Sequence, residues 1–506
     1  MSDANKNKSG YESHLDEYGI EFDLTDIGNA DRFQKNFPTG FSYVQEEGHW
    51  IVWDGRHWTS NDALKAIQKC AEESMKRIYN EARDCTNKRG QFELTRHAQR
   101  SQNKAKIDPM LGILKHRLNV SVRDFDTDPE LINCRNGVLN LRTGELSQHN
   151  EEQRFTKMTT TDYRPQATCP RWEKFLNEIF IGDADLIRYL KRALGYSLTG
   201  YTKEHKLFLM YGLGSNGKTT LVETILDILG DYGRTAEFSS FLDSDKSNAR
   251  SLEAVGLLKG MRFATASETG SSKRWNEALI KKITGGDTLT GTKLHKSTFE
   301  FRPSHKLWFQ ANHLPGAKDA SHGFWRRIVV IPFKAKIEGK AKMPGLKDRL
   351  LREEREGIFA WLAEGAREYL SEDTLGELPR SCVEATESYR TDMDVVSRYI
   401  NDRLEETMQE SLGCSEAHDD YLQWCVSQKE EPAPLKYFID ACVERGLIKH
   451  RKPKGVVFLN RRLKSLSSNF EGRQIQIPFE KDVQRQRTIY PQVGITSAED
   501  ILAGLD

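Results

Sequence analysis

Three features are scarce or missing in this 506-residue chain, and each absence narrows the classes of protein to which it can belong. The sequence contains no run of about 18 apolar residues, so no membrane-spanning helix is expected. The N-terminal stretch MSDANKNKSGYESHLDEYG lacks the apolar segment of a secretory signal peptide. Neither sign of charge dominates, because 75 Lys and Arg residues oppose 74 Asp and Glu residues. A nucleic-acid-binding protein of this composition would have to concentrate its cations locally.

Cysteine usage points to a reducing compartment. The eight cysteines are scattered and none forms a CxxC pair. Free thiols in the cytoplasm fit that pattern best, and we expect a cytoplasmic protein. Cys414, His418 and Cys425 lie close in sequence, but their spacing matches no standard zinc site.

The length predicts several domains, since single cores stop growing beyond about 250–300 residues. Residues 61–117 have a helical pattern and are rich in Lys and Arg. The predicted divisions are a disordered N-terminus (1–20), an N-terminal α+β and helical region (21–120), a helical collar region (121–199), a central core (200–345), a helical segment with a linker (346–411), a small basic unit (412–465) and a tail (466–506).

A short aromatic segment near the N-terminus predicts a β-hairpin. Residues 41–59, FSYVQEEGHWIVWDGRHWT, alternate apolar and polar side chains and contain an Asp-Gly turn. Trp50, Trp53 and Trp58 have two interpretations. They can form the core of a small sheet, which we favour, or they can stack on nucleic-acid bases.

The central region alternates strand and helix patterns. Apolar runs at 206–211, 261–266, 306–311 and 328–333 predict buried strands, with helix-like stretches between them. Strands that alternate with helices predict an α/β sheet domain. On either side, 170–195 has apolar residues at helical spacing and 346–370 has the pattern of one amphipathic helix.

The strongest motif is a phosphate-binding loop. The segment GLGSNGKT, from Gly212 to Thr219, fits GxxxxGK[ST] and lies between a predicted strand and a predicted helix. Glycines let successive backbone N–H groups face phosphates, Lys218 adds a point charge and Thr219 offers a hydroxyl to Mg²⁺. ATP or another NTP, with Mg²⁺, is therefore the expected cofactor set. The predicted nucleotide-binding residues are Gly212, Gly214, Ser215, Asn216, Gly217, Lys218, Thr219 and Thr220.

Polar residues follow the next strand patterns in an order that suits NTP hydrolysis. Glu268 ends the run MRFATASE and is the predicted acid that orients Mg²⁺ and polarises water. Asn312 ends KLWFQAN and is the predicted sensor of the γ-phosphate or attacking water. Either Arg326 or Arg327, just before the last strand, can stabilise transition-state charge. The alternatives are a strand-end carboxylate, a turn amide and a surface arginine pair.

In this order, the segments GLGSNGKTT, FATASE, LIKKITGGDTLTGTKLHK, WFQANHLP and GFWRRIVVIPF resemble those of superfamily 3 helicases. The resemblance is to the branch with satellite-phage and poxvirus primase-helicases and covers about residues 125–335. It implies an AAA+-like core that assembles as a hexamer around DNA. Lys218, Thr219, Glu268 and Asn312 would then act in cis, and one of the two arginines would act on the next subunit.

The resemblance also implies a DNA-contacting hairpin within Thr290–Phe301. Its cations Lys293, His295 and Lys296 would face the pore, where they can step along phosphates. The alternative is a solvated charged hairpin. A primase domain precedes the helicase in many relatives, but only about 120 residues do so here, with no convincing cluster of acids. Primase activity is therefore not expected.

The basic unit near the C-terminus predicts a winged helix. Helical patterns at 416–426 and 433–446 precede a strand–turn–strand pattern at 447–459. Phosphate contacts suit such a wing, although an exposed charged turn is the alternative. The predicted wing cations are Lys449, Arg451, Lys452 and Lys454.

These observations predict an α/β protein that unwinds duplex DNA for the replication of a phage, plasmid or integrated element. The expected partners are single-stranded and forked duplex DNA, further copies of the chain and a separate primase or polymerase, with no membrane. Two rivals stay open. One is a P-loop ATPase that loads, packages or translocates DNA without unwinding it, and the other is an origin-binding protein with a regulatory nucleotide site.

Overall fold

The computed structural model describes residues 15–243, 247–268, 274–292, 298–317, 322–338, 343–428, 430, 432–453 and 455–464. The chain divides into two compact units, Met1–Asp394 and Val395–Asp506. Each unit has its own buried apolar core. No helix of the described residues is long and apolar enough to cross a membrane.

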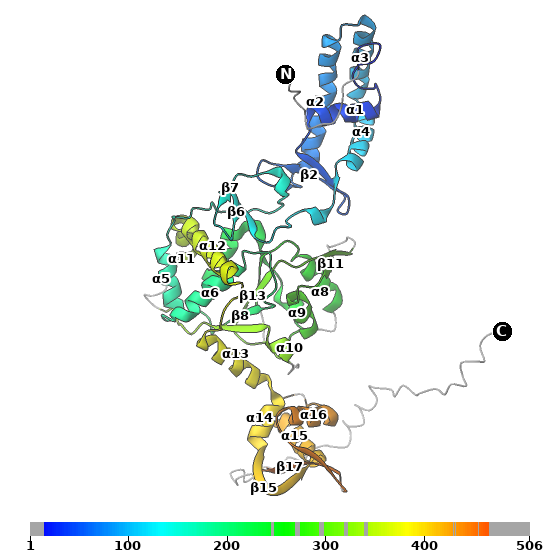
Figure 1. The fold of residues 1–506 in the computed structure, drawn as a ribbon. Coiled ribbons are helices and arrows are strands. Elements are labelled where there is room, and N and C mark those ends of the chain that lie inside the picture. The colour runs from blue at the N-terminus through cyan, green and yellow to red at the C-terminus, as the bar shows by residue number, and fades with distance from the viewer. Residues whose placement is uncertain are drawn as a thin grey trace, which may run out of the picture. The chain divides into compact units, whose positions relative to one another are not determined.

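The first unit begins with helices around a small sheet (Figure 1). Trp50 and Trp58 are buried in this sheet, and the Trp58 indole N–H donates to the carbonyl of Glu151 at 2.9 Å. Their burial supports the interpretation of the tryptophans as core residues. The elements are α1 (Asp26–Asn36), β1 (Phe41–Val44), β2 (His49–Trp53), β3 (Trp58–Thr59), α2 (Ala63–Asp84), α3 (Lys88–Ser101), α4 (Lys104–Arg117) and β4 (Asn119–Val120), and the strand order is β3-β2-β1-β4.

A three-stranded sheet and two helices follow. Gly195 on α6 lies against α12 (Arg355–Glu372), because a Cβ at this position would fall 2.1 Å from the backbone N of Ala366. This close approach packs α6 directly against α12. The elements are β5 (Leu131–Cys134), β6 (Gly137–Asn140), β7 (Leu146–Ser147), α5 (Pro170–Ile179) and α6 (Ala184–Tyr196).

The centre of the first unit is a parallel five-stranded sheet, which confirms the α/β prediction. Its strand order is β14-β8-β13-β10-β9, so the strand before the phosphate loop lies in the interior of the sheet. The elements are β8 (Leu207–Tyr211), α7 (Lys218–Leu229), β9 (Gly233–Thr235), α8 (Ser247–Gly256), β10 (Phe263–Ser267), α9 (Glu277–Thr284), β11 (Leu289–Thr292), β12 (Thr298–Phe301), β13 (Lys306–Ala311), α10 (His322–Trp325) and β14 (Ile328–Pro332).

Helices cover both faces of this sheet, which explains why its strands read as continuous apolar runs. Along β8, Phe208 and Met210 join a core with α5, α6, α7 and α12, whereas Leu207 and Leu209 join a core with α8, α9 and α10. Figure 1 shows the two helical layers on either side of β8 and β13. Because both faces of the sheet are packed in apolar cores, polar side chains of a functional site are expected at the ends of its strands.

The helical stretch after the sheet differs from the prediction of one helix over 346–370. The structure has α11 (Leu346–Glu353), α12 (Arg355–Glu372) and a further helix, α13 (Arg380–Met393). The break falls at Glu354, whose carboxylate accepts hydrogen bonds from the backbone N–H groups of Arg171 and Trp172, at 2.8 and 2.9 Å. The sequence pattern cannot reveal this contact, because the two segments lie 182–183 residues apart.

The second unit starts earlier than residue 412, where the sequence placed its start. Its core includes Tyr399 of α14 and Leu404 and Leu412 of β15, besides the predicted helices. The basic strand–turn–strand prediction is confirmed by the antiparallel pair β16–β17. The elements are α14 (Val395–Arg403), β15 (Leu404–Gly413), α15 (Cys414–Gln428), α16 (Leu435–Glu444), β16 (Lys449–Lys452) and β17 (Gly455–Leu463), with strand order β15-β17-β16.

Candidate active site

The loop between β8 and α7 has a backbone that requires glycine. Gly214 and Gly217 have φ angles of 59° and 88°, in the left-handed region. A Cβ on Gly212 would lie 2.4 Å from the amide nitrogen of Asn216 and 2.5 Å from the carbonyl oxygen of Phe333. α7 then begins at Lys218, and no described side chain caps its first turn. Its free N–H groups and the positive end of its dipole form a site for an anion.

Lys218 is the cation of this site. Its side chain is buried, with the residue 6% exposed, and the ammonium donates to the Gly212 carbonyl and, at 3.1 Å, to Oδ1 of Asn312. Burial lowers the pKa of Lys218, and the nearby Glu268 carboxylate opposes that shift. The structure therefore brings the predicted phosphate cation and the predicted sensor amide into direct contact.

Glu268 follows β10 directly, at the same edge of the sheet. Its Oε2 accepts hydrogen bonds from the backbone N–H groups of Asn312 and His313, at 2.9 and 2.7 Å. Its own backbone N–H donates to the carbonyl of Gln310 at 2.9 Å. The ends of β10 and β13 are thus joined through the carboxylate, which is held at the mouth of the phosphate loop.

Gln310 was not predicted as a site residue. It lies on β13, 9% exposed, and its Oε1 is 3.5 Å from Oγ1 of Thr219. Asn312 was identified because it ends the strand; residues two apart on a strand share a face, so Gln310 could have been identified from its position two residues before Asn312. Gln310 was not predicted because it lies inside the apolar run that identifies the strand, and not at its end.

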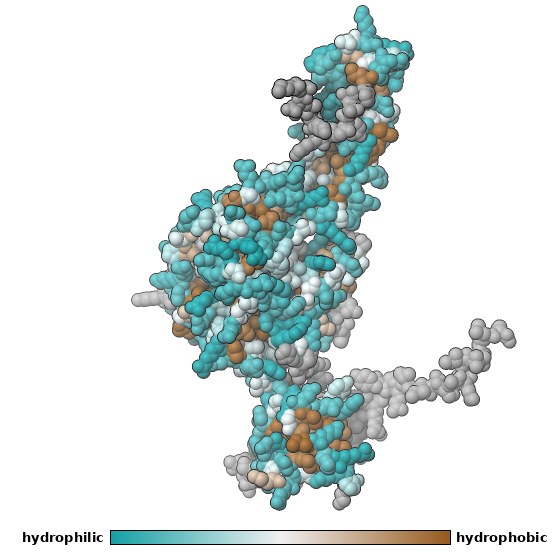
Figure 2. Space-filling view, viewed as in Figure 1, coloured by the Kyte–Doolittle hydropathy of each residue, from teal (hydrophilic) through white to brown (hydrophobic). Residues whose placement is uncertain are grey.

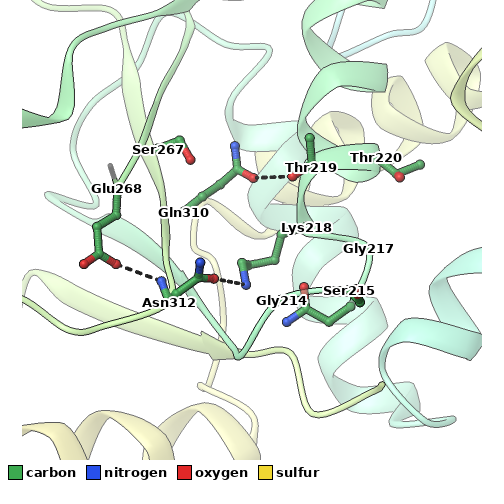
Figure 3. Close-up of a pocket in the computed structure, with 11 residues that line it drawn as sticks. Gly214, Ser215, Gly217, Lys218, Thr219, Thr220, Ser267, Glu268, Gln310 and Asn312 are labelled. Carbon is green, nitrogen blue, oxygen red and sulfur yellow. Dashed lines mark hydrogen bonds between the residues drawn. The ribbon is translucent and has the colours of Figure 1, made fainter. Parts of the chain in front are cut away.

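These groups surround one cavity of about 280 Å³ (Figure 3). Apart from Gly212, which shapes the turn behind it, every predicted nucleotide-binding residue lines the cavity, as do Glu268 and Asn312. Ser267 and Gln310 are additions to the predicted set. The hydroxyl, carboxylate and amide oxygens of Thr219, Glu268 and Gln310 belong to the donor class that Mg²⁺ prefers, so the residues present fit that ion.

The two arginines lie elsewhere, at the amino end of β14. Arg327 is engaged within the chain, since it donates to Thr284 Oγ1 at 3.1 Å and to the Gly323 carbonyl. Burial lowers its pKa, and the neighbouring Arg326 lowers it further. The Arg326 side chain is exposed and forms no hydrogen bond or ion pair with the residues that the structure describes.

The predicted DNA contacts are only partly described. Strands β11 and β12 pair antiparallel, which agrees with a hairpin over Thr290–Phe301, but Lys293, His295 and Lys296 lie outside the described residues. On β16, Lys449, Arg451 and Lys452 are all exposed, and Lys452 also donates to Ser411 Oγ at 2.6 Å. Lys454 also lies outside the described residues.

Comparison with known proteins gives two family models and a set of viral relatives. A model described as "D5 N terminal like" matches residues 30–181, and one described as "Family of unknown function (DUF5906)" matches residues 210–327. "Putative helicase L207/L206" of Acanthamoeba polyphaga mimivirus is 24% identical over 83% of this chain and 46% of its own length. "Putative helicase 184R" of Invertebrate iridescent virus 6 is 26% identical over 79% of this chain and 42% of its own length.

The chain is related to viral proteins of the superfamily 3 helicase–primase branch. A "Putative primase" of African swine fever virus belongs to the same set, at 23% identity over 60% of this chain and 34% of its own length. The chain thus spans less than half the length of these relatives. A solved apo structure of the NrS-1 C terminal region is 12% identical, with 85% of this chain and 99% of that chain covered and a TM-score of 0.44.

Proposed function

We propose that this chain is an ATP-dependent, ring-forming DNA helicase that acts in the replication of a phage, plasmid or integrated element. The observation that carries the proposal is the cavity at the carboxyl edge of the sheet. There a glycine loop at a helix N-terminus, a buried lysine, a carboxylate and two amides face one another. A site for binding alone would not need the carboxylate, whereas hydrolysis needs a group that orients water.

The chemistry follows from the positions of these groups. The N–H groups of the loop and the Lys218 ammonium would hold the β- and γ-phosphates. Asn312, already 3.1 Å from that ammonium, would then lie beside the γ-phosphate. Glu268 would accept a proton from the attacking water. Bound Mg²⁺ would neutralise phosphate charge, and Thr219 together with Glu268 would hold it.

The position of Arg326 supports the proposal that several copies of the chain assemble into a ring. The strands of the sheet are parallel, and β14 separates the amino edge, where Arg326 lies, from the carboxyl edge with the cavity. Five residues of strand span about 16 Å, which is too far for Arg326 to reach its own cavity around the sheet. An exposed arginine in that position suits the γ-phosphate of a neighbouring copy, as expected for a hexamer with arginine fingers. Arg327 would brace the segment.

Two further elements would contact DNA. The hairpin β11–β12 would carry Lys293, His295 and Lys296 into the pore of the ring. The second unit has the element order α14-β15-α15-α16-β16-β17, which is that of a winged helix, and β16–β17 would be its wing. The exposed Lys449 and Arg451 suit phosphate contacts, and Lys452 and Lys454 would add to them.

A forked DNA duplex with one labelled strand tests the proposal. With ATP and Mg²⁺ the chain should separate the strands, and Lys218→Ala, which loses the phosphate cation, should not. ATP turnover without strand separation would instead favour a translocating, loading or packaging ATPase. ATP binding without turnover would favour an origin-binding protein with a regulatory site. Size measurement in the presence of DNA and nucleotide should give a hexamer, and a monomer under these conditions would contradict the ring.

A further inference from the structure

The helical hairpin of α2 and α3 has one face whose charge the active site does not explain. The exposed charged residues of α2 are mixed, with cations Lys65, Lys69, Lys76 and Arg83 and acids Glu72, Glu73 and Asp84. Those of α3 are all cations: Lys88, Arg89, Arg96 and Arg100. The one carboxylate on α3, Glu93, is half-buried and pairs with Arg96 at 2.8 Å. The two helices of this hairpin therefore differ in exposed charge, which is mixed on α2 and positive on α3.

The charged residues of α3 are also ordered. Lys88, Phe92, Arg96 and Arg100 follow one another at steps of four, which places them in a line along one side of the helix. Phe92 is 63% exposed at the middle of that line. The Arg96 guanidinium lies over its ring, with 5.9 Å between the carbon of the guanidinium and the ring centre. Figure 2 shows apolar side chains exposed among hydrophilic ones on this part of the molecule.

A solvated charged face would explain the cations but not the aromatic ring among them. An exposed ring between cations is the combination that binds unpaired nucleic acid, because every base has a face that can stack and every nucleotide carries a phosphate. Gln99, exposed on the same side, adds an amide that can bond to a base edge. Paired bases are stacked on one another, so a duplex would use the cations and not the ring.

We propose that this face of α3 binds single-stranded DNA, with Phe92 stacking on a base and Lys88, Arg96 and Arg100 contacting phosphates. The choice of DNA as the polymer rests on the proposed function, but the binding itself requires no nucleotide. The face would hold one strand of a fork outside the sheet domain. It is a site in addition to the hairpin β11–β12 and the wing.

The test is the binding of a labelled oligothymidine to the full chain without nucleotide, over a range of salt concentrations. Phe92→Ala should weaken binding about tenfold and leave the salt slope unchanged, because it removes stacking and no charge. The double substitution Arg96→Ala with Arg100→Ala should lower the slope by about 1.4, at about 0.7 for each lost phosphate contact with a single strand. The matched control, Lys65→Ala with Lys69→Ala on α2, should change neither quantity.

Two further measurements make the result specific. Phe92→Ala should not change the affinity for a duplex of equal length. An oligothymidine that carries 4-thiothymidine should crosslink, on irradiation, to the peptide that contains Phe92. If Phe92→Ala is silent on the single strand, if the α2 control weakens binding as much as the α3 variant, or if the crosslink maps elsewhere, the inference is wrong. A chain that shows these effects without hydrolysing ATP would retain the inference and lose the proposed function.

Discussion

The two edges of the central sheet use similar polar residues in opposite ways. At the carboxyl edge, Lys218, Glu268 and Gln310 surround a cavity. At the amino edge of the same strands, Arg262 and Lys306 are 3% and 1% exposed. Arg262 donates to the carbonyls of Leu198, Asp128 and Leu131, and Lys306 to those of Thr199, Tyr201 and Ser304.

The difference shows that a buried cation is not by itself a sign of an active site. Burial lowers the pKa of Lys306, and the neighbouring Arg262 lowers it further, yet every donor direction of that ammonium meets a backbone carbonyl. Five of the six carbonyls that Arg262 and Lys306 contact belong to segments 128–131 and 198–201, which precede the sheet, and the sixth is that of Ser304. The buried cations of the amino edge therefore bind these two segments to the sheet. Lys218, in contrast, shares its cavity with groups that can act on a ligand.

Arg326 is the one cation of the amino edge to which we assign chemistry, and its removal should have the largest effect. Arg326→Ala should lower ATP turnover about 10³-fold, because an arginine finger stabilises transition-state charge by that order. Mixing this variant with Lys218→Ala should restore part of the turnover, since some interfaces would join an intact loop to an intact arginine. Absence of rescue at every mixing ratio, with subunit exchange demonstrated, would contradict action in trans.

Loss of the Arg262 guanidinium tests the structural role of the amino edge. Arg262→Met should lower the free energy of unfolding of the first unit by about 3 kcal/mol, because one buried and two partly buried carbonyls lose their donor. Denaturant unfolding followed by tryptophan fluorescence measures it. The matched control is Arg234→Met, an exposed cation on the neighbouring strand β9, with an expected change below about 0.5 kcal/mol. Equal changes in the free energy of unfolding of the two variants would contradict a structural role particular to Arg262.

His305 makes the stability of the same edge depend on pH. Burial and the adjacent Lys306 lower its pKa to about 3. The unfolded chain takes up a proton near pH 6.5 and the folded chain does not, so this stability is full above pH 6.5 and is lost as pH falls toward 3. At pH 5 the loss should be about 2 kcal/mol. His305→Leu should flatten the dependence of unfolding free energy on pH between 7 and 5, and an unchanged slope would contradict the assignment.

Gln310 should have the smallest effect, because its contact with Thr219 is long, at 3.5 Å. Gln310→Leu should lower ATP turnover about tenfold and raise the Mg²⁺ concentration that turnover requires, since the Thr219 hydroxyl loses the group beside it. Affinity for nucleotide without Mg²⁺ should stay as in the unmodified chain. A normal Mg²⁺ dependence in Gln310→Leu would mean that Gln310 only fills the edge of the cavity.

Sequence reasoning located the polar groups of the carboxyl edge and missed the roles of Arg262 and Lys306 at the amino edge for the same physical reason. The phosphate loop, Glu268 and Asn312 are each defined by a local pattern, a strand that ends in a polar group, and parallel strands bring such ends together. Lys306 is the first residue of a strand, but its role depends on the carbonyls of Thr199 and Tyr201, more than 100 residues away. The break at Glu354 and the addition of β15 to the second unit were missed because they too depend on distant contacts.

The most direct test of the account is the behaviour of Glu268→Gln in two measurements on the same preparation: ATP affinity and ATP turnover. The amide keeps the size of the side chain and can still accept hydrogen bonds from the N–H groups of Asn312 and His313, but it is a far weaker base. We predict an ATP affinity within about twofold of the unmodified chain and a turnover lower by about 10² or more. Turnover at the normal rate would show that Glu268 does not activate water, which would contradict the hydrolytic mechanism proposed for the carboxyl edge.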